Sequence, residues 1–169
     1  AFAFVKEHFQ QQDLEISKKL RLVIVGGGSE ESKLKGMARH LGISDQCNWV
    51  GKVPHPEVQN YLNMFDVFAA LSRSESFGVS VIEASACGLP VVVSDAGGLP
   101  EVVKEGETGF VVPRENPEEA GKAMIRLIDD PDLRRVMGEK GRQHVMREYE
   151  WDHCVGLLEG VLKEISGIS

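Results

Sequence analysis

The first two thirds of the chain alternate between short apolar runs and segments whose apolar residues have helical spacing. The runs are rich in β-branched residues and end at Gly, Pro or polar residues, as buried strands do; they lie at 20–25, 48–50, 67–71, 91–93 and 109–112. Helices are expected between them at 29–41, 57–64 and 79–87, with a helical turn at 99–103. This alternation predicts an α/β domain with a doubly wound parallel sheet.

The pattern changes after residue 113, where strands are no longer expected. Three amphipathic segments predict a helical C-terminal tail, at 117–129, 132–149 and 151–165. Near the start, Phe2, Val5 and Phe9 mark one face of a helix. No linker or repeat divides the sequence, so we expect one domain over 1–169, made of a helix-and-loop remnant at 1–19, an α/β core at 20–113 and C-terminal helices at 114–169.

Charge and cysteine usage narrow the class of protein. The 169 residues carry 26 Asp and Glu against 19 Lys and Arg, a net charge of −7. Binding nucleic acid through counterion release needs a basic surface, so no nucleic-acid partner is expected. A small anionic ligand remains compatible, because a local site can oppose the global charge. Cys47, Cys87 and Cys154 are far apart and no metal-ligand cluster flanks them, which predicts free thiols in a reducing cytoplasm and no metal site.

The loop at 72–78, between a predicted strand and helix, has the sequence SRSESFG. In an open α/β sheet, ligands bind at the carboxyl ends of the strands, where loops run into helix N-termini. Ser76 is the expected N-cap of the helix, and Gly78 lets a ligand approach the backbone. The free N–H groups of Phe77, Gly78 and Val79, with the helix dipole, predict an anion site suited to a diphosphate.

Two carboxylates bracket this anion site. Glu83 lies in the helix, roughly 7 Å along its axis from Gly78 at ~1.5 Å per residue, where it can accept hydrogen bonds from both hydroxyls of a ribose. Glu75 lies in the loop, on the other side of the site. The spacing fits a grip on the two ends of a nucleotide-sugar, and equally two solvated surface carboxylates.

Two further glycine-rich loops follow predicted strands. Gly97 and Gly98 either bring N–H groups to a ligand or form a simple tight turn. The loop at 26–30 matches neither G-x-G-x-x-G nor the P-loop pattern, so NAD and P-loop nucleotide binding are not expected.

Six stretches together resemble the C-terminal, donor-binding half of retaining GT-B glycosyltransferases of family 4, the glycosyl transferases group 1. They follow in the family's order from about residue 20 to 151: 25–28, 50–51, 74–78, 83–92, 97–101 and 109–113. The resemblance implies a Rossmann-like half of a GT-B fold that binds a UDP-sugar or GDP-sugar as donor substrate. It further implies hexosyl transfer with retention, without metal or cofactor, in the synthesis of a polysaccharide or glycolipid.

The resemblance also gives roles to individual positions. Glu83 corresponds to the ribose-binding carboxylate, and Glu75 to the first Glu of an E-x7-E motif, a catalytic position that orients sugar hydroxyls without acting as a nucleophile. The remaining donor-binding positions contact diphosphate, sugar or nucleobase mainly through the backbone: Gly27, Val50, Gly51, Phe77, Gly78 and Val79.

The sequence departs from the family pattern at its start. The family's donor half begins with a further strand and a Gly-rich loop that carries an Arg, followed by a Lys, whereas this sequence begins at Ala1, without Met, in the helix that follows. We therefore expect a piece of a longer enzyme, inactive alone, that lacks its N-terminal acceptor domain; any membrane association would be peripheral and through the parent enzyme. Two alternatives stay open: a non-catalytic donor-like module for assembly, and half of a sugar-nucleotide epimerase. No partners are expected for His40, His55 and His144, which we place at the surface or in loops.

Overall fold

Within residues 1–166, which the computed structural model of the chain describes, strands alternate with helices over the first two thirds. The strands are β1 (Leu22–Val25), β2 (Cys47–Gly51), β3 (Phe68–Ala70), β4 (Val91–Ser94) and β5 (Gly109–Val112). The helices are α1 (Phe2–Gln12), α2 (Leu14–Lys19), α3 (Glu31–His40), α4 (His55–Leu62), α5 (Val79–Ala86), α6 (Leu99–Val102), α7 (Pro117–Asp129), α8 (Pro131–Glu148) and α9 (Trp151–Ser166), and a 3-10 turn spans Ser44–Gln46. The expected α/β class is confirmed.

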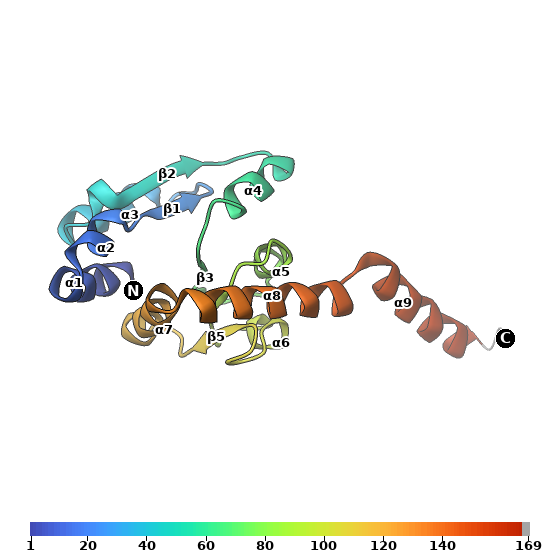
Figure 1. Cartoon of the computed structure of the whole chain (residues 1–169). Helices are drawn as coiled ribbons and strands as arrows, with labels where there is room; N and C mark the ends of the chain where they lie inside the picture. Colours follow the sequence, from blue (N-terminus) through green and yellow to red (C-terminus); the bar gives the residue numbers. More distant parts are fainter. Residues whose placement is uncertain (167–169) are drawn as a thin grey trace.

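The strands pair in parallel, as the alternation predicted, but they form two sheets. One contains β1 and β2, and the other has the order β3-β4-β5. Figure 1 shows the first sheet with α1, α2 and α3 on one side of the molecule and the second sheet beside α5, α6 and α8. Among the described residues, β1 pairs with a strand along one edge only, and the same is true of β3.

The core lies around β4, whose four residues are all buried because β4 has a strand on each edge and helices on both faces. On one face, Val91 and Val93 pack with residues of α5 and α6 such as Val81 and Leu99. On the other face, Val92 packs with α7 and α8, for example with Leu127. Alternate residues of one strand thus serve two apolar clusters, as in a three-layer domain.

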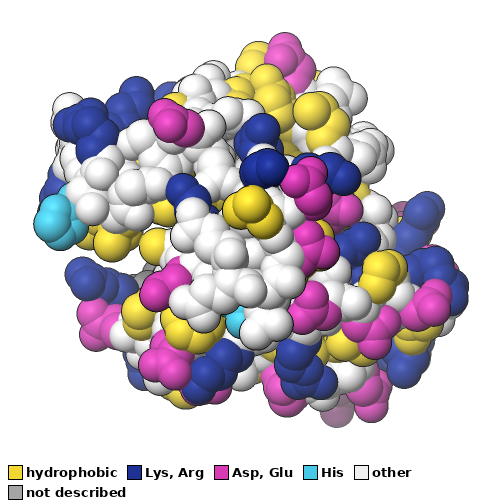
Figure 2. All heavy atoms as spheres, turned by 60° about the vertical axis from the view of Figure 1, so that its left-hand side comes forward, with side chains coloured by type: hydrophobic (Ala, Val, Ile, Leu, Met, Phe, Trp, Pro, Cys, Tyr) yellow, Lys and Arg dark blue, Asp and Glu magenta, His cyan; other side chains and the backbone are white. Residues whose placement is uncertain are grey.

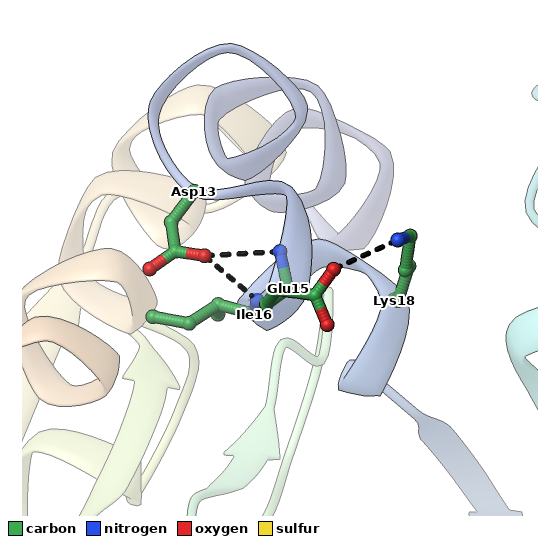
Figure 3. A network of polar contacts seen from close by, with 4 residues as sticks. All are labelled: Asp13, Glu15, Ile16 and Lys18. Atoms are coloured by element: carbon green, nitrogen blue, oxygen red, sulfur yellow. Dashed lines mark hydrogen bonds and ion pairs between the residues drawn. The ribbon is translucent and has the colours of Figure 1, made fainter.

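The N-terminal segment contains two helices, whereas the sequence predicted one helix and a loop over 1–19. Asp13 explains the difference, because its Oδ1 accepts hydrogen bonds from the N–H groups of Glu15 (3.0 Å) and Ile16 (3.1 Å) and so starts a new helix (Figure 3). A pair between Lys18 and Glu15 at 2.8 Å supports the same helix (Figure 3). The apolar face of α1 is buried against α7, where a Cβ on Gly121 would lie 2.5 Å from Phe4 Cδ1.

The C-terminal helices confirm the expected helical tail. α8 packs closely against the end of α5, since a Cβ on Gly138 would lie 2.0 Å from the carbonyl oxygen of Gly88. α9 extends away from the rest of the molecule (Figure 1), and most of its large apolar side chains are exposed: Trp151, Leu157, Leu158, Val161, Leu162 and Ile165. None of the described helices is long and apolar enough to cross a membrane.

Candidate functional site

The loop before α5 ends at Gly78, which is buried and has φ of +94°, a left-handed conformation that favours glycine. A Cβ at this position would also lie 2.8 Å from Leu99 Cδ2, so glycine is required for space as well. Gly78 is the N-cap residue and no side chain caps the helix, which corrects the prediction that Ser76 would do so. The N–H of Val81 donates to the carbonyl oxygen of Gly78 at 2.9 Å, so the N–H groups of Val79 and Ser80 at the helix start have no partner within the helix.

The turn at Gly97 and Gly98 lies directly against this loop. Gly98 N–H donates to the carbonyl oxygen of Glu75 at 3.3 Å, and a Cβ on Gly97 would stand 1.6 Å from that same oxygen. A Cβ on Gly98 would lie 2.7 Å from the carbonyl oxygen of Ser76. The paired glycines are thus needed for the close approach of two loops, a role that differs from both sequence interpretations, N–H groups brought to a ligand and a simple tight turn.

Glu75 and Glu83 both belong to this loop–helix unit and are both partly buried. Glu75 Oε1 accepts a hydrogen bond from the N–H of Ser76 at 3.0 Å, which holds its carboxylate beside the loop backbone. Glu83 lies in α5, and its Oε1 is 2.9 Å from His55 Nε2 at the start of α4. Sequence reasoning missed this partner of His55; the contact joins residues 28 positions apart, and no local pattern signals it.

The His55–Glu83 contact joins the two halves of the site. The His55 side chain is 83% exposed and that of Glu83 30%, so solvent screens the pair and its contribution to stability is small. The contact matters for the position of the Glu83 side chain, because α4 follows β2 whereas α5 follows β3. The carboxylate of Glu83 is therefore oriented by a residue of α4, the helix that follows the other sheet.

Gly27, Val50 and Gly51 lie together at the carboxyl ends of β1 and β2. The N–H of Gly26 donates to the carbonyl oxygen of Gly51 at 2.8 Å, and a Cβ on Gly27 would lie 3.5 Å from Lys52 Cγ. Gly51 has φ of +79°, again in the left-handed region. The structure thus gathers the predicted site residues in two groups, this one and the group from Glu75 to Glu83 on the β3–α5 unit.

The charges near the site are mixed. Arg73, in the loop before α5, pairs with Glu115 at 2.9 Å, and Arg114 lies 3.3 Å from Asp95 at the end of β4. Figure 2 shows positive and negative side chains interspersed over one face of the molecule. No group of three or more His, Cys, Asp or Glu side chains within the described residues is placed to hold a metal ion.

The predicted surface or loop histidines need a second correction. His144 is 8% exposed, because α8 buries it against Tyr149, whose ring centroid lies 6.0 Å away. Burial, together with the charge of Lys104, lowers the pKa of His144 below its usual value. The three cysteines are free, as predicted, and burial raises the pKa of the Cys47 and Cys87 thiols.

Known proteins share this arrangement. A family model described as glycosyl transferases group 1 matches residues 3–144. A GDP-mannose-dependent monoacylated alpha-(1-6)-phosphatidylinositol monomannoside mannosyltransferase of Corynebacterium glutamicum is 35% identical over 85% of the chain and 39% of its own length. Sucrose-phosphate synthase from Thermosynechococcus elongatus superposes with a TM-score of 0.81 at 29% identity, over 88% of this chain and 39% of that one. The Anabaena protein HepE in complex with UDP, at 22% identity, shares the fold with a TM-score of 0.76 over 88% of this chain and 41% of its own.

The length of the match also matters. The chain spans between 33% and 39% of the length of the curated relatives it matches. Within that span the expected recognition, the Rossmann-like half of a GT-B fold, is confirmed by the sequence match and by the structural similarity. Since the family model covers residues 3–144, the chain belongs to the glycosyl transferases group 1 family.

Proposed function

We propose that residues 1–169 form the nucleotide-sugar-binding domain of a hexosyltransferase that uses a UDP-sugar or GDP-sugar as donor. The observation that carries this proposal is the β3–α5 unit, in which Gly78 opens the helix N-terminus between Glu75 and Glu83. The N–H groups at the start of α5 receive the diphosphate and Glu83 receives the ribose hydroxyls. The group formed by Gly27, Val50 and Gly51 lies against the nucleobase.

During sugar transfer, the site has to stabilise the diphosphate as it leaves. The bond between the anomeric carbon and the diphosphate oxygen breaks, the acceptor hydroxyl bonds to the same face of the sugar, and the hydroxyl proton leaves with the diphosphate. Negative charge grows on the diphosphate as this happens, and fixed N–H donors at Val79 and Ser80 stabilise it without a metal or a cofactor. Glu75 orients the sugar hydroxyls.

Two relatives support the choice of donor class. The Anabaena HepE structure contains UDP, and the Corynebacterium relative is described as GDP-mannose-dependent. We propose that the acceptor binds to another domain of the full-length protein, since this chain corresponds to little more than a third of such enzymes. The free cysteines support a cytoplasmic enzyme, and a polysaccharide or glycolipid product completes the proposal.

Calorimetry on the full-length protein tests donor binding directly. UDP, GDP and their hexose conjugates are titrated, and Glu83→Gln is expected to weaken the preferred nucleotide at least tenfold, because a charge-assisted hydrogen bond contributes about 1.5–3 kcal/mol. Glu7→Gln, which removes an exposed carboxylate of α1, is the matched control and leaves affinity unchanged. If no nucleotide binds to the wild-type protein, a non-catalytic assembly module replaces this proposal.

The reaction class has its own test. Transfer from the preferred donor is expected to continue in EDTA, and the product is expected to keep the anomeric configuration of the donor in proton NMR. Loss of activity that added Mg²⁺ or Mn²⁺ restores would refute the metal-free mechanism while leaving nucleotide binding intact.

A further inference from the structure

A cavity lined by polar and charged side chains, none of them among the predicted donor-site residues, lies between α8 and the loop at 104–108 that leads into β5. Its volume is about 180 Å³. Sites that enclose a drug-sized ligand usually measure ~300–1,000 Å³, so this cavity suits a small group rather than a whole nucleotide-sugar.

His144 lines this cavity and is nine-tenths buried, with 8% of its surface exposed. Neither Nδ1 nor Nε2 of its ring has a hydrogen-bond partner among the described residues. By contrast, the neighbouring Thr108 hydroxyl accepts a hydrogen bond from the N–H of Lys104 at 2.9 Å. Buried polar atoms in native proteins are nearly always hydrogen-bonded, so two buried and unpartnered ring nitrogens in a residue that lines the cavity point to a partner that binds there.

The charges around the cavity favour an anion. Lys104, Lys140 and Arg147 line it, against the single carboxylate of Glu107. Within the described residues neither lysine takes part in an ion pair, whereas Arg147 Nε lies 2.7 Å from Glu148 Oε1. Three cations at one small cavity in a chain of net charge −7 are a local reversal of the overall field. Guanidinium and ammonium groups around a compact anion are the recognised chemistry of phosphate binding.

We propose that this cavity binds a phosphoryl group, carried as inorganic phosphate, as a small phosphomonoester or as a lipid headgroup. Lys104, Lys140 and Arg147 supply the charge, and His144 donates a ring N–H from the wall of the cavity. The site is separate from the donor diphosphate site, which is built from backbone N–H groups of α5.

Binding of a phosphoryl group is expected to change the pKa of His144. Burial and the positive charges of Lys104 and Arg147 lower the pKa of His144, while Glu148 and Glu107 oppose them. Lys140 is the remaining charged group at the cavity. A bound phosphoryl dianion neutralises the effect of the cations, so it raises the pKa of His144.

Hydrogen–deuterium exchange at the histidine C2 position, read by mass spectrometry, reports the pKa of each histidine in the full-length protein. Inorganic phosphate, added at constant ionic strength against chloride, is expected to raise the pKa of His144 saturably and to leave that of His8 in α1 unchanged. Lys104→Gln and Lys140→Gln, both at exposed positions, each raise the concentration needed for half-saturation at least tenfold. Lys19→Gln removes the same charge from α2 and shifts it less than twofold.

Two further probes distinguish a soluble phosphomonoester from a lipid headgroup as the source of the phosphoryl group. Tighter binding of glycerol 3-phosphate than of inorganic phosphate supports a soluble phosphomonoester. Flotation with vesicles of phosphatidylcholine and phosphatidic acid that Lys140→Gln abolishes and Lys19→Gln does not supports a headgroup. The proposal is overturned if phosphate leaves the pKa of His144 unchanged, or if chloride changes it equally. It is also overturned if Lys140→Gln and Lys19→Gln change the phosphate concentration at half-saturation by the same factor.

Discussion

Replacing Gly97 by Ala tests the close contact on which the position of Glu75 depends. The added methyl would stand 1.6 Å from the carbonyl oxygen of Glu75 and 2.8 Å from its carbonyl carbon. The oxygen would have to retreat by roughly 1.8 Å to restore ordinary van der Waals contact. The contacting atoms belong to the backbone, so no side-chain rotation relieves the clash.

Three costs add up in this variant. Gly97 has φ of +52°, and an L-residue in the left-handed region costs about 1–2 kcal/mol. Losing the hydrogen bond from Gly98 N–H to the carbonyl of Glu75 costs about 1 kcal/mol, and overpacking adds about 1–3 kcal/mol. We expect a loss of about 3–6 kcal/mol in the free energy of unfolding, a large share of the ~5–15 kcal/mol typical of proteins.

Two glycines supply matched controls for urea denaturation. Gly106→Ala has the same backbone demand, with φ of +73°, but nothing within 4 Å of its Cβ, so it isolates a loss of about 1–2 kcal/mol. Gly28→Ala has neither demand and is expected to change stability by less than about 0.5 kcal/mol. Because Glu75 moves with its loop, kcat/KM of Gly97→Ala should fall by about 100-fold. A Gly97→Ala variant no less stable than Gly106→Ala would refute the close approach of the two loops.

Three further predictions concern the fold around the site. Because the pKa of buried His144 is lowered from 6.5, the unfolded chain takes up its proton first as the pH falls; His144→Leu should therefore lose less stability than wild type between pH 7 and 5 in urea titrations at a series of pH values. Gly138→Ala would place a Cβ 2.0 Å from the carbonyl oxygen of Gly88, so its free energy of unfolding in urea should fall by about 2–3 kcal/mol. Gly156 in α9 has nothing within 4 Å of its Cβ, so Gly156→Ala should instead raise the helix content measured by circular dichroism. Val92→Ala, at a fully buried position of β4, should lower stability by about 2–3 kcal/mol in the same denaturation assay.

The sequence predicted helices and strands well where residues such as Pro and Asp mark their ends. The apolar run at 91–93 lies within β4 (Val91–Ser94), because Pro90 and Asp95 bound it on either side. α8 begins at Pro131, one residue earlier than expected, because Pro fits the first turn of a helix and Asp130 Oδ1 caps it through the N–H of Leu133 at 2.8 Å.

The details of the loop before α5 were less accessible to sequence reasoning. Ser76 has the residue type of an N-cap, yet Gly78 takes that position because its left-handed backbone turns the chain into the helix. The choice depends on the packing of Gly78 against Leu99, twenty-one residues later. Residue preference alone carries no information about that contact.

The mutual position of the two halves of the site is the least predictable feature. The runs in β1 and β4 are almost equally apolar, yet all four residues of β1 are half-buried and all four of β4 are buried. Burial is set by how many strands and helices cover a strand, and a four-residue run does not encode its own place in a sheet. The residues that we propose for the nucleobase follow β1 and β2, and those that we propose for the diphosphate follow β3, so the proposed site spans two sheets that the strands themselves do not join. Two contacts join them: α1 packs on α7 through Phe4 and Gly121, and His55 reaches Glu83 from the start of α4. The geometry of the proposed nucleotide-sugar site therefore depends on helix packing as much as on the residues that line it.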